Sequence, residues 1–89
     1  MEDKVIEIID DLCLGKSIDD IEDIFIKDSR VSWFRYGDEN IDDGITEEDA
    51  EDMYVMCRYY DMIVEGVSVC VDFYFGDYTR TVEHIDYDF

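Results

Sequence analysis

The strict alternation of residues 67–75, VSVCVDFYF, constrains the fold more than any other feature of the sequence. Valine or phenylalanine occupies every odd position, and serine, cysteine, aspartate or tyrosine occupies every even one. Because successive side chains of a β-strand point to opposite faces, this pattern predicts a strand with one face in a core and the other toward solvent. An antiparallel sheet buried on one face is therefore expected.

A hairpin is predicted directly after this strand. Residues 76–77 are Gly-Asp, and glycine at the first central position favours a two-residue type II′ turn. Such a turn places Val71 opposite Val82 and Val69 opposite His84. In this register His84 shares the apolar face of the hairpin.

Two helices are predicted near the N-terminus from apolar residues that recur once per helical turn. Residues 3–13 form the first helix, and Gly15 ends it because glycine tolerates a left-handed backbone. Residues 18–27 form the second helix. Ser17 precedes it, with Asp20 three residues later in the capping-box spacing.

The middle of the chain completes the predicted α+β fold. Residues 31–36, VSWFRY, indicate a short strand in which Trp33 packs in the core. Residues 46–66 favour a third helix after a capping motif, although residues 53–64 also suit a strand because they are rich in Tyr, Val, Cys and Ile. We therefore expect one domain over residues 1–89 with the order ααβαββ, in which helices cover one face of a small antiparallel sheet of about three strands.

Residues 37–52, GDENIDDGITEEDAED, are the most one-sided stretch in charge, with nine carboxylates and no basic residue. The whole chain has a net charge of −19, yet its 47% hydrophobic content is too high for a disordered acidic tail. A folded domain with so much like charge repels itself, so the block indicates a basic partner. The predicted partner-binding residues are Asp38, Glu39, Asp42, Asp43, Glu47, Glu48, Glu51 and Asp52.

The same charge excludes other classes of partner. A strongly acidic surface repels nucleic acid and anionic membranes, so neither is an expected direct ligand. The sequence shows no signal peptide and no apolar run long enough to span a membrane, and we expect a cytoplasmic protein. Its three cysteines, Cys13, Cys57 and Cys70, are odd in number and widely spaced, which predicts reduced, buried thiols.

Metal binding and catalysis have little support in the sequence. Residues 38–49 start like a calcium-binding EF-hand loop, but Asp43 stands where the turn requires glycine and Asp49 where a bidentate Glu is usual. His84 is the single imidazole, and the predicted register puts it on the face opposite Cys70. We therefore predict no metal, no cofactor and no enzymatic activity.

The tyrosines near the acidic block leave two interpretations open. Tyrosine beside carboxylate is typical of a protein-binding hot spot rimmed by charge, whereas tyrosine in a small sheet usually packs with only its hydroxyl outward. The residues concerned are Tyr54, Tyr59, Tyr60, Tyr74 and Tyr78.

In size, charge and lack of a catalytic motif, the chain resembles the small acidic DNA-mimic proteins that phages use against bacterial defences, including anti-CRISPR and anti-restriction proteins. The resemblance implies an inhibitor that occupies the DNA-binding or PAM-reading cleft of a CRISPR effector or a restriction enzyme. We expect a monomer or dimer in the host cytoplasm. The alternative is an immunity protein or antitoxin that neutralises a basic toxin away from its nucleic-acid cleft. A calcium-responsive binding module is a third hypothesis.

Overall fold

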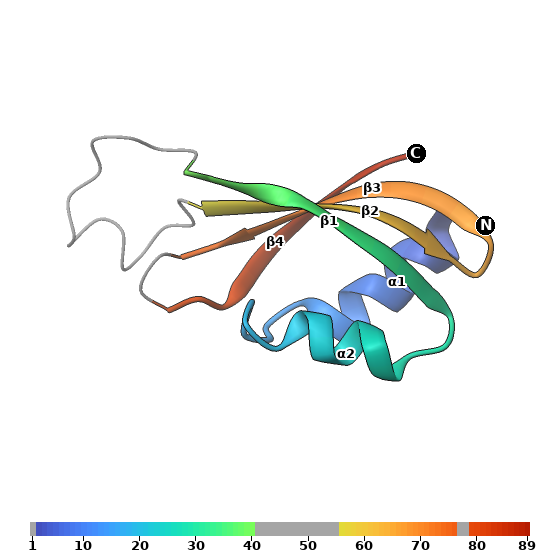
Figure 1. Ribbon diagram of the computed structural model, residues 1–89, viewed down its shortest axis with the longest axis horizontal. Coiled ribbons are helices and arrows are strands. Elements are labelled where there is room, and N and C mark those ends of the chain that lie inside the picture. The colour runs from blue at the N-terminus through green and yellow to red at the C-terminus, as the bar shows by residue number, and fades with distance from the viewer. Residues whose placement is uncertain (1, 41–55, 77–78) are drawn as a thin grey trace.

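A computed structural model of the protein describes residues 2–40, 56–76 and 79–89. Four strands form one antiparallel sheet in the order β1-β2-β3-β4, and both helices lie against the same face of it (Figure 1). The described elements are α1 (Glu2–Cys13), α2 (Ile21–Lys27), β1 (Val31–Asn40), β2 (Met56–Val64), β3 (Val67–Phe75) and β4 (Val82–Asp88).

The α+β class is confirmed, but the sheet of about three strands and the order ααβαββ are wrong, since the described elements follow the order ααββββ. Residues 56–64, where a helix was favoured, form strand β2. Glu65 and Gly66 both have positive φ, 52° and 80°, and they join β2 to β3 as a two-residue turn of the hairpin type. Residues 46–55 of the predicted helix lie outside the described residues.

Strand β1 is longer than predicted and includes the start of the acidic block. The sequence predicted residues 31–36, whereas the strand continues to Asn40. Its register against β2 shifts between Arg35 and Gly37, so one extra residue is accommodated as a bulge. The strand therefore continues through Gly37, beyond its predicted end at residue 36.

Strand β3 has the predicted bounds, but its predicted pairing with the next strand is wrong. Val82 lies opposite Phe75, and Val71 lies opposite Tyr87. The reason is a competing set of backbone bonds: the Val82 amide donates to the Lys16 carbonyl at 2.8 Å, and the Val82 carbonyl accepts from Gly15 at 2.9 Å. The chain before β4 thus pairs with the connection between α1 and α2, and β4 begins later than a two-residue turn allows.

The same connection delays the start of α2. The Ile18 amide donates to the Arg80 carbonyl at 2.7 Å, and Ser17 forms a β-bridge with Thr81. Because the backbone of residues 17 and 18 pairs with residues 80 and 81, the helix begins at Ile21 and not at residue 18. Helix α1 agrees with prediction, and Gly15 follows it with a φ of 82°.

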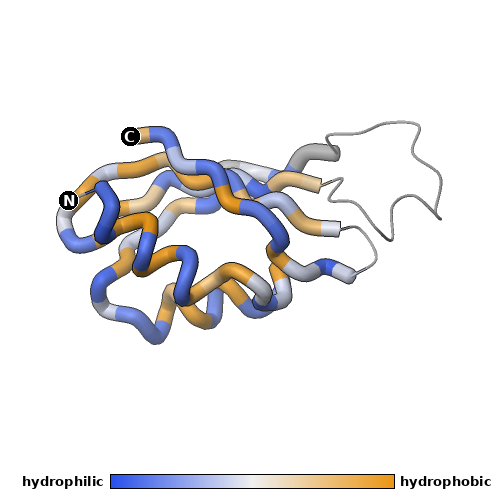
Figure 2. Tube along the Cα trace, turned by 180° about the vertical axis from the view of Figure 1, so that it is seen from behind, coloured by the Kyte–Doolittle hydropathy of each residue, from blue (hydrophilic) through white to orange (hydrophobic). Residues whose placement is uncertain are grey.

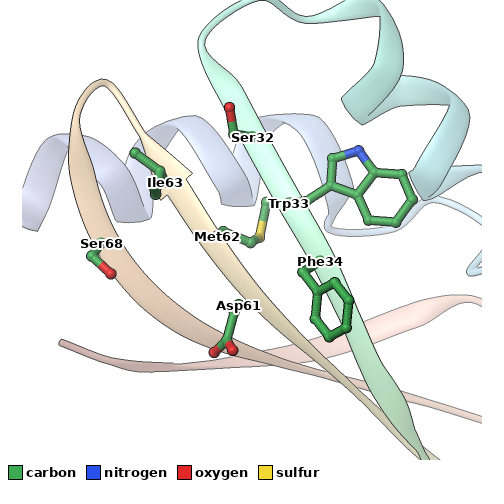
Figure 3. A pocket seen from close by; sticks show the side chains of 7 residues that line it. All are labelled: Ser32, Trp33, Phe34, Asp61, Met62, Ile63 and Ser68. Carbon is green, nitrogen blue, oxygen red and sulfur yellow. The ribbon is translucent and has the colours of Figure 1, made fainter.

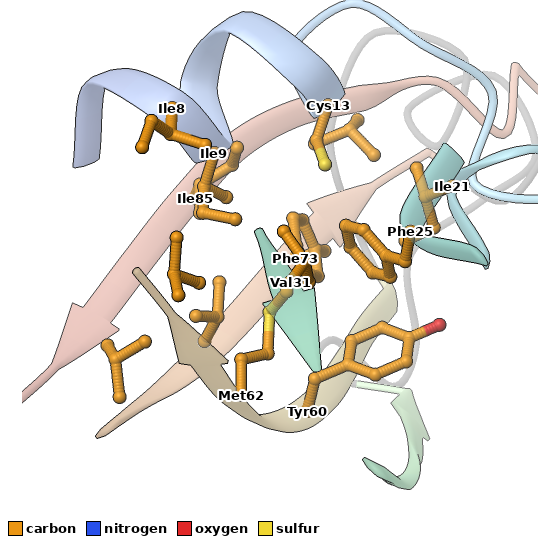
Figure 4. Close-up of a cluster of buried hydrophobic side chains, with 14 of the residues drawn as sticks. Ile8, Ile9, Cys13, Ile21, Phe25, Val31, Tyr60, Met62, Phe73 and Ile85 are labelled. Atoms are coloured by element: carbon orange, nitrogen blue, oxygen red, sulfur yellow. The ribbon is translucent and has the colours of Figure 1, made fainter. Parts of the chain in front are cut away.

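The core lies between the helices and the inner face of the sheet (Figure 4). At its centre, the rings of Phe25 and Phe73 approach Tyr60 with centroids 5.6 and 5.5 Å away. Trp33 packs partly buried against this cluster, as predicted. Hydrophobic and hydrophilic residues alternate along β3, whereas the second face of the sheet as a whole carries both polar and apolar residues and is partly exposed (Figure 2).

Replacement of Phe73 by alanine should destabilise the protein by about 3–5 kcal/mol, because it leaves a cavity beneath both helices. Urea denaturation followed by Trp33 fluorescence measures this change. Ile26→Ala is the matched control, since Ile26 is 70% exposed and its loss should change the free energy of unfolding by less than about 0.5 kcal/mol. Equal effects of the two variants would contradict the placement of Phe73 in the core.

Candidate functional site

Asp38, the first of the predicted partner-binding carboxylates, has two arginine partners within the chain. Its Oδ1 accepts a hydrogen bond from Nε of Arg58 at 2.7 Å, and its Oδ2 accepts one from Nη2 of Arg35 at 2.7 Å. Arg58 is only 6% exposed. Burial opposes ionisation of Asp38, but the two guanidinium groups hold its pKa below its usual value. Asp38 therefore has a structural role, and its role in partner binding stays a prediction.

This ion pair extends into a cluster that ties α2 to the strands. The Tyr60 hydroxyl donates to Oε2 of Glu22 at 2.7 Å, and Arg35 donates to the same oxygen at 3.4 Å. Arg58 also donates to the Ile18 carbonyl at 3.3 Å. Glu22, in the first turn of α2, thus connects this helix to strands β1 and β2.

The other predicted partner-binding residues are described in part or not at all. Glu39 belongs to β1, where its backbone lies opposite Cys57. Asn40 pairs with Met56, and this pair is the last one of β1 with β2. Residues 41–55 connect the two strands there. The predicted residues outside the described part are Asp42, Asp43, Glu47, Glu48, Glu51 and Asp52.

A second group of carboxylates, which the sequence did not single out, lies on the outer face of the sheet, the face turned away from α1 and α2. Asp72 on β3 lies opposite Asp86 on β4, and Cys70 lies opposite both Asp61 and Asp88. Side chains directly opposite each other in a sheet are about 5 Å apart. Partial burial and then the charges of Asp86 and Asp88 raise the pKa of Asp72. We call Asp61, Asp72, Asp86 and Asp88 the outer-face carboxylates.

The seven lysines and arginines lie away from the outer-face carboxylates. Each arginine bonds to a carboxylate on the helix side of the molecule or at its edge: Arg30 to Asp28 at 2.6 Å, Arg80 to Asp19 at 2.9 Å, and Arg35 and Arg58 to Asp38. The hydrogen bonds from Arg30 lower the pKa of Asp28 to about 2. The lysines are Lys4 in α1, Lys16 in the connection after it, and Lys27 in α2. Negative charge is therefore compensated mainly on the side away from the outer face.

Apolar and aromatic side chains accompany the outer-face carboxylates. Phe34 and Ile63 are 66% and 51% exposed, and they line a hollow with Ser32, Asp61 and Ser68 (Figure 3). A second hollow beside it is lined by Tyr59, Asp61, Cys70 and Asp72. Of the tyrosines whose role was open, Tyr60 packs in the core, whereas Tyr59 and Tyr74 occupy positions on the outer face.

Sequence reasoning missed this face for an identifiable reason. The alternation of β3 already placed Asp72 away from the core. Asp61 was hidden because its segment was interpreted as a helix, and the β4 carboxylates were misplaced by the wrong hairpin register. Interpreting residues 56–64 as a strand would have placed Asp61 on the outer face together with Asp72.

His84 and Cys70 both differ from prediction. His84 lies opposite Tyr74 on the outer face and not beside Val69, and its Nε2 is 2.7 Å from Oδ1 of Asp86. Cys70 is exposed, although Cys13 and Cys57 are buried as predicted. Its thiol donates to Asp61 at 3.0 Å, and this hydrogen bond raises the pKa of Cys70. The thiolate that a nucleophile requires is thereby disfavoured.

Asp38 and Asn40, which begin the loop resembling an EF-hand, lie in the extended strand β1. Within the described ranges, no group of three or more His, Cys, Asp and Glu side chains is arranged to hold a metal ion. The part of the chain that the structure describes also contains no helix of the length and apolarity needed to cross a membrane.

Comparisons of the chain with protein-family models, with curated proteins and with solved structures found no match.

Substitution of Asp38 by asparagine should lower the free energy of unfolding by about 2 kcal/mol at pH 7, because it leaves the buried Arg58 incompletely paired. Since the folded-state pKa of Asp38 is below the ordinary 3.8, its stabilisation is present above that pH and is lost as pH falls through the folded pKa. Urea titrations at several pH values measure the difference. Asp11→Asn, on the exposed side of α1, is the control, and an equal effect would contradict a structural Asp38.

Substitution of Asp72 by asparagine should act in the opposite direction. Because the folded-state pKa of Asp72 is raised, its ionised carboxylate destabilises the fold at neutral pH. This destabilisation disappears below the ordinary pKa of 3.8, where the carboxyl group is protonated in the folded and the unfolded chain. The variant should gain roughly 0.5 kcal/mol at pH 7, because like charges opposite each other in a sheet repel. Thermal unfolding at pH 7 and pH 3 checks this, and Glu7→Gln on α1 serves as the control. A less stable variant at pH 7 would refute the repulsion.

Proposed function

We propose that this protein is a DNA-mimic inhibitor that binds the basic nucleic-acid or PAM-binding cleft of a bacterial defence nuclease, with a CRISPR effector first and a restriction enzyme second. The observation that carries the proposal is the separation of charge in the fold. The arginines are paired with Asp19, Asp28 and Asp38, whereas the outer-face carboxylates lie on a surface that contains no lysine or arginine.

The spacing of these carboxylates suits a site that binds phosphates. Alternate residues of a strand are about 7 Å apart, and residues facing each other across two strands are about 5 Å apart. Duplex DNA presents one phosphate per strand about every 3.4 Å of its axis. A cleft that spaces arginine and lysine side chains for phosphates can therefore form charge-assisted hydrogen bonds with carboxylates held at this interval.

The acidic block is a second source of negative charge in the sequence. Residues 41–55 connect the paired residues Asn40 and Met56, and they carry seven further carboxylates. Their repulsion is a cost to folding that binding to a basic cleft would relieve. A protein selected only for stability and solubility would not concentrate charge in this way.

The resemblance to small acidic phage inhibitors supports the same conclusion through size and charge. An immunity protein or antitoxin would be as acidic, but it would bind its toxin away from the nucleic-acid cleft. The two functions differ in one measurable property, which is whether inhibitor and nucleic acid exclude each other from the target.

Bound inhibitor should prevent target DNA from binding the nuclease, and the inhibition should weaken as salt rises, because counterions compete for the same pairs. Mobility-shift assays with purified CRISPR effectors and restriction enzymes measure both effects. A complex that contains inhibitor and DNA together would refute mimicry and favour the immunity function. Inhibition that is independent of salt would also count against the proposal.

Matched variants test the role of the acidic block in the same assay. Four neutral substitutions in the block, Asp42→Asn, Asp43→Asn, Glu47→Gln and Glu48→Gln, should weaken inhibition at least about tenfold, because each removes a charge-assisted pair. Four substitutions on the helices, Asp3→Asn, Glu7→Gln, Asp11→Asn and Asp23→Asn, change the net charge equally and should have a much smaller effect. Equal losses would mean that only net charge matters.

A further inference from the structure

We propose that the outer face of the sheet contacts the basic partner through two adjacent hollows, one for an apolar side chain and one for an arginine. Recognition then depends on more than net charge. This inference rests on the proposed function, because it names the part of the chain that meets the basic cleft.

The apolar hollow lies beside Ile63, near the end of the outer face where β2 turns into β3. Ile63 lies between Ser32 on β1 and Ser68 on β3, and these small side chains leave it 51% exposed. Phe34 closes one end of the hollow and is itself 66% exposed (Figure 3). Two large exposed apolar residues lining one hollow on so acidic a chain are typical of a contact surface, because burying them against a partner is favourable.

The arginine hollow lies next to it, around Tyr59. Tyr59 has Asp72 opposite it on β3, and both residues line this hollow. Asp61 follows two residues later on the same face of β2 and lines the same hollow. A guanidinium group can lie flat against a tyrosine ring while it donates to two carboxylates, and the ammonium of lysine lacks that planar geometry.

Asp61 lines both hollows, which restricts the kind of occupant. The occupant must present an arginine and an apolar side chain next to each other, as a protein segment can and a polyamine cannot. A second copy of this chain is disfavoured, because each copy carries a charge of −19. The geometry therefore fits an arginine-bearing protein surface with an apolar neighbour.

The first test locates the site with defined peptides. The full-length ¹⁵N-labelled protein is titrated with a ten-residue peptide of alternating arginine and leucine, and with matched lysine–leucine and arginine–serine peptides. The arginine–leucine peptide should bind about tenfold more tightly than either control, because only it fills both hollows. Its amide shifts should concentrate at residues 32–34, 59–63 and 68–72. Equal affinities, or shifts confined to the helices, would overturn the inference.

The second test separates the two hollows with variants of exposed or partly exposed residues, whose folding is checked by circular dichroism. The double variant Phe34→Ser with Ile63→Ser should lose about tenfold in affinity for the arginine–leucine peptide with an unchanged salt dependence. Asp61→Asn with Asp72→Asn should reduce the salt dependence and remove the preference for arginine over lysine. Glu7→Gln with Asp11→Asn, which changes the net charge equally, should change affinity less than about threefold. Equal losses of affinity in the Asp61/Asp72 and Glu7/Asp11 double variants would also overturn the inference.

The same variants distinguish this inference from the proposed function. If wild-type protein excludes DNA from its nuclease and both outer-face double variants inhibit equally well, this inference falls and DNA mimicry stands. If the peptides bind as expected while no nuclease loses its DNA, the proposed function falls and the contact surface stands.

Discussion

The structure depends on the burial of alternate side chains of one antiparallel sheet beneath two short helices. Helices α1 and α2 have 12 and 7 residues, and both lie against the same face. Apolar burial is the main favourable term in folding, so every strand commits its alternate residues to that face. The remaining residues of each strand are left to face outward, and the chain could place charge there without disturbing the core.

Charge compensation follows from this division into two sides. Arg58 reaches inward from β2 and is buried, so it requires the carboxylate of Asp38 beside it. Arg80 pairs with Asp19 and so joins the chain before β4 to the connection between α1 and α2, whereas Arg30 pairs with Asp28 within the connection between α2 and β1. Among the described residues, the outer-face carboxylates have no such arginine partner and keep their negative charge. In this fold, the carboxylates that pair with arginines and the outer-face carboxylates are different residues.

The two acidic regions differ in whether the amino-acid sequence alone reveals them. The block of residues 37–52 is visible as composition, because its carboxylates are consecutive. The outer-face carboxylates come from three strands, with Asp61, Asp72 and Asp86 separated by more than ten residues each. Only strand pairing brings them together, and only the covering of the opposite face by helices makes their face the exposed one.

By itself, the sequence determined the elements whose signals are local. The bounds of β3, the buried face of α1 and the glycine after it are specified by periodicity and by backbone freedom. Tertiary structure alone decided that residues 56–64 are a strand, because an apolar segment of that length suits helix and strand equally and the choice depends on β1 and β3 on either side. It also decided the register of β4 and the partners of Asp38, since both depend on backbone and arginine groups far away in sequence, which no local pattern encodes.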